Sequence, residues 1–370
     1  MSVSKLCEEL VNVGKHVEVL TTTANGDTEL NVKTGVTIFL DGVPVTYFNR
    51  LIKGNNHLSP TLLFGIWKRL RLKELSHLRS IVHIHAWWNM VSVGSCLLTH
   101  LLSGKVILSP RGTLSNYSFG NRKSLAKNIF HRTIGKHMLN RCHFHVSTEK
   151  EKQDILNILS PRSICVIPNF VEFPGITFDK KPSDTARKTT VFKLLFLSRV
   201  EEKKGLDILF AALAKSAFNY HLTIAGTGDP GYIGSLETLI SELGIQQDIS
   251  WIGQQSNGQK FLLLAEHDLM VLPSHDESFA NVVVESLSEG TPVLISSNVG
   301  LADYVRSKDL GWVYEDGSEN LKIDLQHAYE QTQKRNRIRM IAPGLIASDF
   351  HEHKLLKQYV DMYSRIIADV

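Results

Sequence analysis

Short apolar runs alternate with amphipathic stretches along the second half of this chain. Three of the stretches between the runs have helical spacing: LDILFAALAKS, SLETLISELG and GQKFLLLAEH. Near-continuous apolar strands separated by helices are typical of a parallel sheet covered on both faces. The pattern therefore predicts a doubly wound α/β domain over residues 192–348. Its expected strands are KLLFLS, HLTIAG, ISWIG, DLMVLPS and TPVLISS.

The first half shows the same alternation less regularly, which predicts a second Rossmann-like domain over residues 1–172. Between the two domains, residues 173–191 are polar, rich in Pro, Lys, Asp and Thr, and without periodicity, as in a linker. Residues 349–370 have helical spacing and predict a helix that crosses back to the first domain. The expected strand ends of the first half are HVEVLTT, VTIFL, SIVHIHAWW, GKVILSPRG, CHFHVST and ICVIPN.

The composition of the chain is that of an ordinary globular protein with two hydrophobic cores, and its charge bears on whether the protein binds nucleic acid or a membrane. The chain has 370 residues, 43% of them hydrophobic and 21% charged, with a formal charge of +4. This mild and mostly dispersed positive charge does not indicate a nucleic-acid-binding protein. Two basic stretches, 67–79 and 121–141, fit either contact with a membrane surface or the solvated faces of amphipathic helices.

Cysteine usage and apolar windows indicate a cytoplasmic protein, at most attached to the inner face of a membrane. Four cysteines are scattered without paired spacing, which argues against a disulfide framework and against a zinc site; they are Cys7, Cys96, Cys142 and Cys165. The N-terminal residues carry charges where a signal peptide needs an apolar run. The most apolar window, 90–108, is interrupted by a histidine, a glycine and a lysine.

Ligands of open α/β sheets bind beyond the carboxyl ends of the strands, so the loops that follow the strands matter most. After KLLFLS come Arg199 and Lys204, followed by Gly205 and a predicted helix. Two cations beside a helix N-terminus form an anion site that fits a diphosphate. The loop alone equally describes a solvated charged turn.

The stretch GTGDPG after HLTIAG resembles a dinucleotide fingerprint only weakly. It contains Gly226 and Gly228, but Pro230 interrupts the turn, and the next strand ends without an acidic residue for a ribose. We interpret the two glycines as positions where the backbone approaches a ligand closely.

The most distinctive stretch is VLPSHDESFANVVVESLSEGTPVLIS. Its pattern places Glu277 in a loop and Glu285 about two turns into the helix that follows. Eight residues at helical rise separate the two backbones by about 12 Å. Carboxylate pairs of glycosidases lie closer together, so this pair fits two parts of an elongated ligand better than one scissile bond. Taken alone, the pair also fits a helix-capping glutamate and an exposed glutamate.

Four segments together carry a resemblance to a known family: VIPN in the first half, SRVEEKKG, AGTGD, and the stretch with Glu277 and Glu285, which we call the E-x7-E stretch. Through these segments the chain resembles the retaining nucleotide-sugar glycosyltransferases of family 4, which have two facing Rossmann domains in the GT-B fold. The resemblance spans nearly the whole chain. It implies that Arg199 and Lys204 bind the donor diphosphate and that Glu277 binds the sugar. It further implies that Glu285 holds the ribose and that the backbone N–H groups of Ser278, Phe279 and Ala280 contact the sugar hydroxyls.

The same resemblance implies the reaction and its partners. A sugar passes from a nucleotide diphosphate sugar to a glycan or lipid-linked acceptor with retention at the anomeric carbon, in the synthesis of a surface polysaccharide such as lipopolysaccharide, capsule or exopolysaccharide. Arg199 and Lys204 stabilise the departing diphosphate, so neither a metal nor any other cofactor is expected. No D-x-D cluster follows a predicted strand.

Two departures from the family pattern stand out. Arg111, in SPRGTLS, occupies the position where many members carry a histidine; Arg111 or His85 is the candidate on the acceptor side, although His83 and His85 also fit structural roles. Trp87 and Trp88 fit either acceptor stacking or core packing. The strand that normally precedes the first helix has no counterpart here, so the first sheet is expected to lack a central strand.

Two other functions remain open from sequence. A non-catalytic nucleotide-binding relative or partner subunit would share the donor loops while its acceptor side is incomplete. A sugar-nucleotide epimerase shares the two-domain architecture, but the E-x7-E stretch combined with RVEEKKG favours transferases. The sequence leaves open the base and sugar of the donor, and the acceptor.

Overall fold

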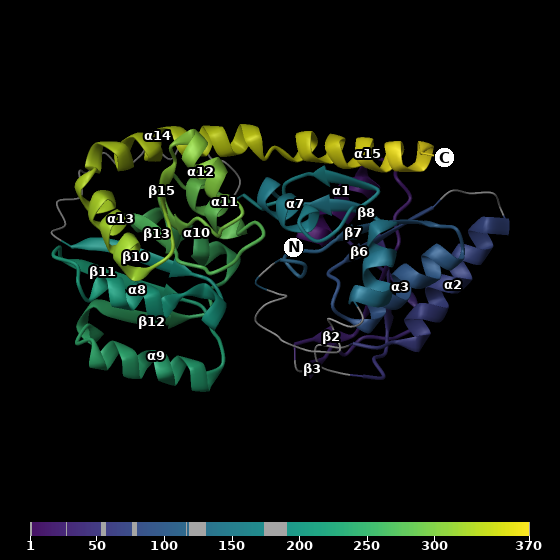
Figure 1. Ribbon diagram of the computed structural model, residues 1–370, viewed down its shortest axis with the longest axis horizontal. Coiled ribbons are helices and arrows are strands. Elements are labelled where there is room, and N and C mark those ends of the chain that lie inside the picture. Colours follow the sequence, from purple (N-terminus) through teal and green to yellow (C-terminus); the bar gives the residue numbers. More distant parts are fainter. Residues whose placement is uncertain are drawn as a thin grey trace. The chain divides into compact units, whose positions relative to one another are not determined.

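The computed structural model describes residues 2–26, 28–52, 57–75, 80–115, 117, 131–173 and 191–369 (Figure 1). The chain forms two compact units. Unit 1 comprises Met1–Phe170 and Glu352–Val370, and unit 2 comprises Val171–His351. Most of the predicted linker, 174–190, lies outside the described residues. No helix among these residues combines the length and the apolar character that crossing a membrane demands.

Unit 2 contains a six-stranded sheet in the order β12-β11-β10-β13-β14-β15, in which every neighbouring pair is parallel. All residues of the central strand β13 are buried, which explains its unbroken apolar sequence. The predicted doubly wound α/β fold is thereby confirmed for this unit. Its strands are β10 (Phe192–Leu197), β11 (Tyr220–Ala225), β12 (Ile249–Gly253), β13 (Leu269–Leu272), β14 (Val293–Ser296) and β15 (Gly311–Tyr314).

Among the described residues of unit 2, five helices connect these strands and two more follow the last strand. Asp229 accepts a hydrogen bond from the Tyr232 N–H as the N-cap of α9, and Pro230 occupies its first turn. A capping box of Ser256 and Gln259 starts α10. The helices are α8 (Leu206–Leu213), α9 (Pro230–Glu242), α10 (Asn257–Glu266), α11 (Asn281–Ser288), α12 (Ala302–Lys308), α13 (Ser318–Glu330) and α14 (Thr332–Asp349), with the 3-10 turns η3 (Glu202–Lys204) and η4 (Gln246–Asp248).

Unit 1 contains a parallel sheet, β6-β7-β8-β9, and a smaller sheet, β1-β5-β4, in which β4 and β5 form an antiparallel pair. Within the described residues no strand joins β1 to β6, so the two sheets remain separate. The strands are β1 (Val19–Thr22), β2 (Ala24–Asn25), β3 (Thr28–Glu29), β4 (Thr37–Leu40), β5 (Val43–Phe48), β6 (Ile81–His85), β7 (Lys105–Ser109), β8 (His143–Val146) and β9 (Ser163–Val166).

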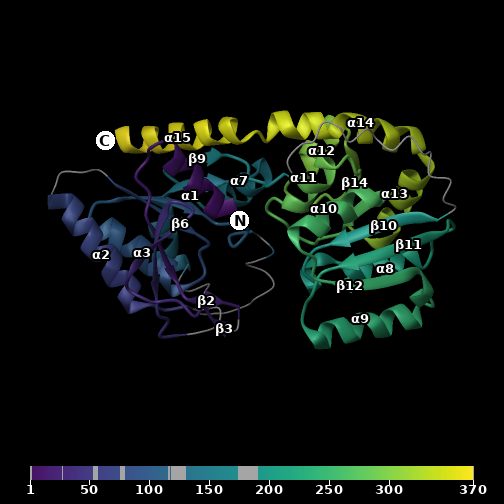
Figure 2. The same ribbon diagram turned by 180° about the vertical axis from the view of Figure 1, so that it is seen from behind.

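The C-terminal helix α15 (Glu352–Ala368) packs on unit 1, as predicted (Figure 2). Its apolar face, including Leu355 and Tyr359, shares a core cluster with Leu6 and Leu10 of the first helix. This contact explains the strongly amphipathic C-terminal sequence. The other helices of unit 1 are α1 (Ser2–Asn12), α2 (Pro60–Leu75), α3 (Met90–Leu101), α6 (Lys136–Asn140) and α7 (Glu149–Leu156), with the π-helical turn η2 (His131–Gly135).

The sequence pattern did not predict β5, β15 or the two-residue strands β2 and β3. Strand β15 has only four residues, and the first of them, Gly311, has no side chain that could contribute to a hydrophobic pattern. A glycine is required there because an added Cβ would lie 2.0 Å from the Val293 carbonyl oxygen. Strand β5 carries Pro44, which disfavoured a strand prediction.

Candidate active site

The strand order of unit 2 creates one switch point, between β10 and β13. From β10 the chain continues to β11 on one side of the sheet, whereas from β13 it continues to β14 on the other. Because β10 and β13 are parallel neighbours, the loops that follow them, 198–205 and 273–280, begin at the same edge of the sheet (Figure 1). Such a point is where open α/β sheets bind ligands.

Lys204 and Glu277, one from each loop, form an ion pair. Both side chains are mostly buried, with exposed fractions of 10% and 17%. The structure thus brings two of the predicted catalytic residues into direct contact. Burial keeps water away from this pair and so strengthens the attraction between the two charges. A ligand phosphate that reached Lys204 would compete with the carboxylate of Glu277 for the same ammonium group.

Further contacts hold the two loops together. The N–H of His275 donates a 2.9 Å hydrogen bond to the carbonyl oxygen of Lys203, and the Lys203 ammonium lies 2.9 Å from a carboxylate oxygen of Asp276. The Asp276 side chain is only 5% exposed. These contacts fix the relative position of the backbones that carry Lys204 and Glu277.

Arg199 lies apart from this pair. Its side chain is 74% exposed and pairs with Glu201 of the same loop. An exposed pair of this kind contributes little stability, so the guanidinium is easily released to another anion. Its contact with a diphosphate stays a prediction.

Three glycines allow the loops of this edge to approach one another. An added Cβ at Gly205, whose φ is +68°, would lie 2.2 Å from the carbonyl oxygen of Pro273. At Gly226 and Gly228 an added Cβ would lie 1.8 Å and 1.9 Å from carbonyl oxygens of the loop after β10. The close approach that we predicted for Gly226 and Gly228 is therefore to a neighbouring backbone, which explains both residues without a ligand.

The backbone of Glu277 is held by the loop after β14. Its N–H donates to the carbonyl oxygen of Asn298 at 3.2 Å, and its carbonyl oxygen accepts from the N–H of Gly300 at 2.8 Å. The side chain of Phe279 is 2% exposed and belongs to the core, so only its backbone is available for a sugar. Ala280 has a φ of +68°, a strained conformation for a residue with a Cβ, directly before α11.

Helix α11 begins at Asn281, later than the spacing predicted. Glu285 consequently lies about one turn into the helix, and the 12 Å estimate, which assumed helical rise throughout, does not apply to the loop part. Glu285 is 8% exposed, so the alternative of an exposed glutamate is wrong. Its carboxylate accepts a 2.8 Å hydrogen bond from Lys260 of α10.

Lys260 was not predicted. Its side chain is 12% exposed, and it forms an ion pair with the mostly buried Glu285. The only signal in the sequence is a lysine directly before the apolar run FLLLA of an otherwise amphipathic helix.

In unit 1, Arg111 and His85 follow or end neighbouring strands of the parallel sheet. Arg111 donates to Asn169 and has a φ of +54°. Burial, with a further contribution from Arg111, lowers the pKa of His85 to about 3, so this imidazole is neutral at neutral pH. His85 could therefore accept or donate a hydrogen bond but supplies no charge.

Neighbouring aromatic residues have structural roles. His83 is hydrogen-bonded on both ring nitrogens, to Tyr363 at 2.8 Å and to Ser109 at 2.7 Å. Trp87 is fully buried, whereas Trp88 is half-buried and donates its indole N–H to the carbonyl oxygen of Thr113. Core packing is thus confirmed for Trp87.

Two family descriptions match this chain. "Glycosyltransferase Family 4" matches residues 1–173, and "Glycosyl transferases group 1" matches residues 177–343. An uncharacterized glycosyltransferase of Methanocaldococcus jannaschii is 28% identical over 173 residues, covering 46% of this chain and 44% of the relative. The lipopolysaccharide core biosynthesis glycosyltransferase LpsE of Rhizobium meliloti is 30% identical over 168 residues, 45% of each chain. The matched part thus spans less than half of these relatives.

Solved structures agree on the fold. Sucrose-phosphate synthase from Thermosynechococcus elongatus superposes with a TM-score of 0.74 at 16% identity, covering 100% of this chain and 93% of that one. HepE from Anabaena, solved in complex with UDP and glucose, superposes with a TM-score of 0.67 at 19% identity, covering 88% and 87%. At this identity the likeness establishes the fold alone.

Proposed function

Because this chain belongs to the glycosyltransferases of group 1 and family 4, we propose that it transfers a sugar from a nucleotide diphosphate sugar to an acceptor hydroxyl, with retention at the anomeric carbon. The observation that carries the proposal is the mostly buried pair of Lys204 and Glu277 at the switch point of the sheet. The binding of UDP and glucose by HepE supports a nucleotide sugar as donor.

In the proposed reaction, the bond between the anomeric carbon and the diphosphate oxygen breaks, and its electron pair stays on the diphosphate. Lys204 leaves Glu277 for the diphosphate, and Arg199 leaves Glu201, so two cations meet the charge as it develops. These cations supply the stabilisation that Mg²⁺ gives elsewhere, so the reaction needs no metal. The acceptor oxygen bonds to the anomeric carbon, and its proton passes to the departing phosphate oxygen.

Glu277, released from Lys204, would orient the sugar through its hydroxyl groups. Backbone N–H groups of Ser278, Phe279 and Ala280, directly before α11, would donate to the same sugar. Glu285 would hold the ribose through a carboxylate whose position is fixed by Lys260. Because Lys260 already fixes the orientation of this carboxylate, the side chain loses less entropy when the ribose binds than a mobile glutamate would.

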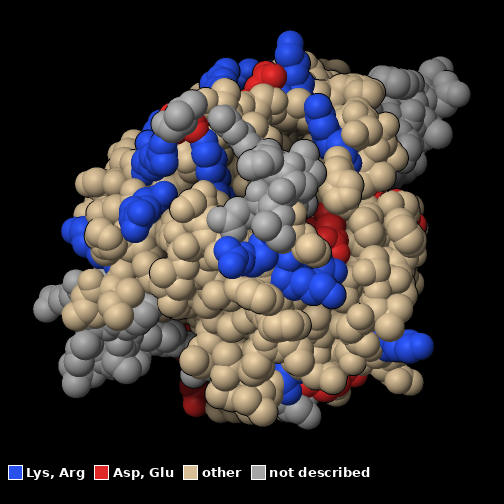
Figure 3. Space-filling view, turned by 90° about the vertical axis from the view of Figure 1, so that its right-hand side faces the viewer, with Lys and Arg blue, Asp and Glu red and all other residues tan. Residues whose placement is uncertain are grey.

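We further propose a glycan or lipid-linked acceptor in surface polysaccharide synthesis, taken up at a membrane surface. LpsE, and WaaG among the solved structures, act in lipopolysaccharide biosynthesis. One face of α2 exposes apolar and basic side chains together: Phe64, Trp67, Lys68, Arg71 and Leu72. On the side seen in Figure 3, Lys and Arg show at more places than Asp and Glu, among residues that are mostly uncharged. Such a surface fits anionic lipid headgroups.

A panel of UDP, GDP, ADP and their sugars tests the donor site by thermal unfolding. A ligand bound only by the folded state stabilises it by about 2.7 kcal/mol at 100 times its Kd. We expect one nucleotide to raise Tm by several degrees and its sugar to be turned over, with EDTA leaving both effects unchanged. A rise in Tm that needs Mg²⁺ would contradict metal independence, and binding without turnover would favour a non-catalytic relative.

A further inference from the structure

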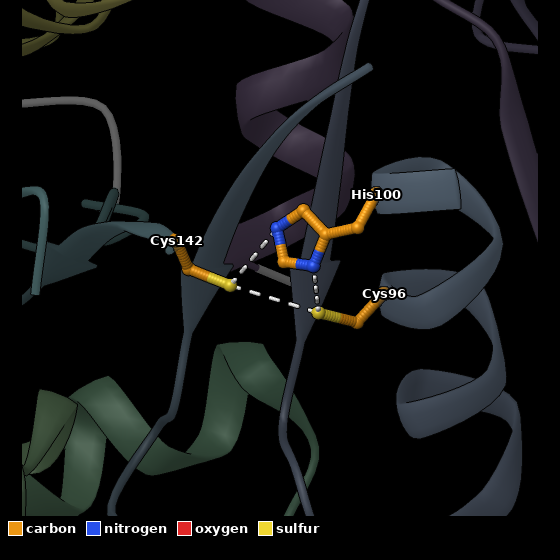
Figure 4. A group of neighbouring side chains, drawn as sticks. All are labelled: Cys96, His100 and Cys142. Atoms are coloured by element: carbon orange, nitrogen blue, oxygen red, sulfur yellow. Dashed lines mark hydrogen bonds between the residues drawn. The ribbon is translucent and has the colours of Figure 1, made fainter. Parts of the chain in front are cut away.

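Three potential metal ligands from distant parts of the sequence meet inside unit 1 (Figure 4). Cys96 and His100 are four residues apart on α3, so their side chains lie on the same face of the helix. Cys142 directly precedes β8. One ligand atom from each residue lies within 4.8 Å of the other two.

The spacing of these atoms fits one ion. The two sulfur atoms are 3.6 Å apart, and the Cys96 sulfur lies 3.8 Å from Nδ1 of His100. Zn²⁺ binds sulfur at about 2.3 Å and imidazole nitrogen at about 2.0–2.1 Å in tetrahedral geometry, which places neighbouring ligand atoms about 3.6–3.8 Å apart. The separation of the two sulfur atoms and that of the Cys96 sulfur from Nδ1 are therefore close to those that a tetrahedral ion requires. The Cys142 sulfur lies 4.0 Å from the other ring nitrogen, Nε2, so the imidazole must turn for one nitrogen to face both sulfur atoms.

Charge and burial favour the same ligand. Both cysteines are fully buried in a cluster with apolar residues such as Leu108 and Phe144, whereas His100 is half-buried. Two thiolates and a neutral imidazole around a divalent cation carry no net charge, so the bound site would tolerate an apolar setting. Thiolate and imidazole are ligands that Zn²⁺ prefers.

A disulfide between Cys96 and Cys142 is the competing explanation. It would need the sulfur atoms to close from 3.6 Å to about 2.05 Å, and it would need an oxidant. It also leaves the position of His100 unexplained, because the imidazole contacts both sulfur atoms, at 3.8 Å and 4.0 Å.

We propose that Cys96, His100 and Cys142 form a binding site for a thiophilic divalent metal ion, Zn²⁺. The ion would fasten α3 to the beginning of β8, and its fourth position would be left to water, since the described residues add no fourth Cys, His, Asp or Glu to the group. This site belongs to unit 1, whereas the residues proposed to bind the donor belong to unit 2. Its role is the stability of unit 1.

Cobalt titration of the full chain tests the site. The protein is stripped with a chelator, kept under a reductant that does not bind metals, and titrated with Co²⁺. We expect the visible d–d bands of tetrahedral thiolate coordination at one ion per chain, their displacement by Zn²⁺, and a higher Tm with Zn²⁺. Cys142→Ser and His100→Ala should lose the bands, whereas Cys165→Ser, a half-buried thiol of β9, should keep them.

A second readout on the unaltered chain keeps the test independent of how well these variants fold. Because both cysteines of the site are fully buried, a thiol reagent reaches them only when unit 1 opens, so two of the four cysteines should be modified more slowly with Zn²⁺ than without it. Absence of cobalt bands in the reduced, unaltered chain would overturn the proposal, as would unchanged bands in Cys142→Ser. Loss of two thiols on oxidation, together with no Co²⁺ binding after reduction, would instead identify a disulfide pair.

Discussion

Replacing Glu277 with glutamine is expected to lower the rate of sugar transfer by a factor of about 10³ or more while the chain stays folded. The substitution keeps the shape of the side chain and one acceptor oxygen but removes the negative charge. Interactions that act on the reacting sugar commonly contribute a factor of 10²–10³ each. Lys204 loses its partner as well, and because its side chain is only 10% exposed, its ammonium loses a charge-assisted contact that water cannot fully replace.

The measurement is the initial rate of transfer, read beside Tm and donor affinity. Glu319→Gln is the matched control, because Glu319 also pairs with a lysine but lies exposed on α13. Its rate should match that of the unaltered chain. A Glu277→Gln variant that folds, binds donor and turns over within tenfold of the unaltered chain would remove Glu277 from the reaction.

The second large effect is expected from Gly205→Ala. The new Cβ would lie 2.2 Å from the carbonyl oxygen of Pro273, and the backbone has a φ of +68°, which alanine adopts at a cost. The two loops must move apart, which separates Lys204 from Glu277. We expect a loss of about 2–4 kcal/mol in the free energy of unfolding and a large loss of transfer.

Gly234→Ala is the control for this substitution. Gly234 lies in α9, and an added Cβ there meets no atom within 4 Å. Alanine should stabilise this helix by up to about 1 kcal/mol. Chemical denaturation measures the free energy of unfolding of both variants and of the unaltered chain. Equal stabilities of Gly205→Ala and Gly234→Ala would mean that the contact between the loops after β10 and β13 is not tight.

Much of unit 2 follows from its sequence because buried parallel strands must be apolar along their whole length. Once β10 and β13 are recognised as parallel neighbours, their carboxyl ends share an edge, and Lys204 and Glu277 are expected to lie near one another. The start of α11 was not predictable in this way. Ala280 takes a left-handed conformation that no propensity of alanine indicates, and the helix begins at Asn281 although helical spacing starts at Phe279.

The remaining differences between the sequence predictions and the structure arise from contacts between residues that are distant in the sequence. The sequence spacing argued against a zinc site because Cys96 and Cys142 are far apart, yet packing of α3 beside the sheet brings their sulfur atoms to 3.6 Å. Lys260 gained its partner in the same manner, by the packing of α10 against α11. Gly226 and Gly228 were assigned to a ligand because sequence does not tell a neighbouring backbone from a bound molecule.

The most direct test of the role of Lys204 compares kcat with donor affinity in Lys204→Ala, beside Lys215→Ala, which removes an exposed surface lysine. A cation that acts on the departing diphosphate stabilises the transition state more than the bound donor. We therefore expect Lys204→Ala to lower kcat by a factor of about 100 or more while the donor Kd rises less than about tenfold, and Lys215→Ala to change neither. Equal losses of affinity and rate, or no loss in either, would contradict the role assigned to Lys204.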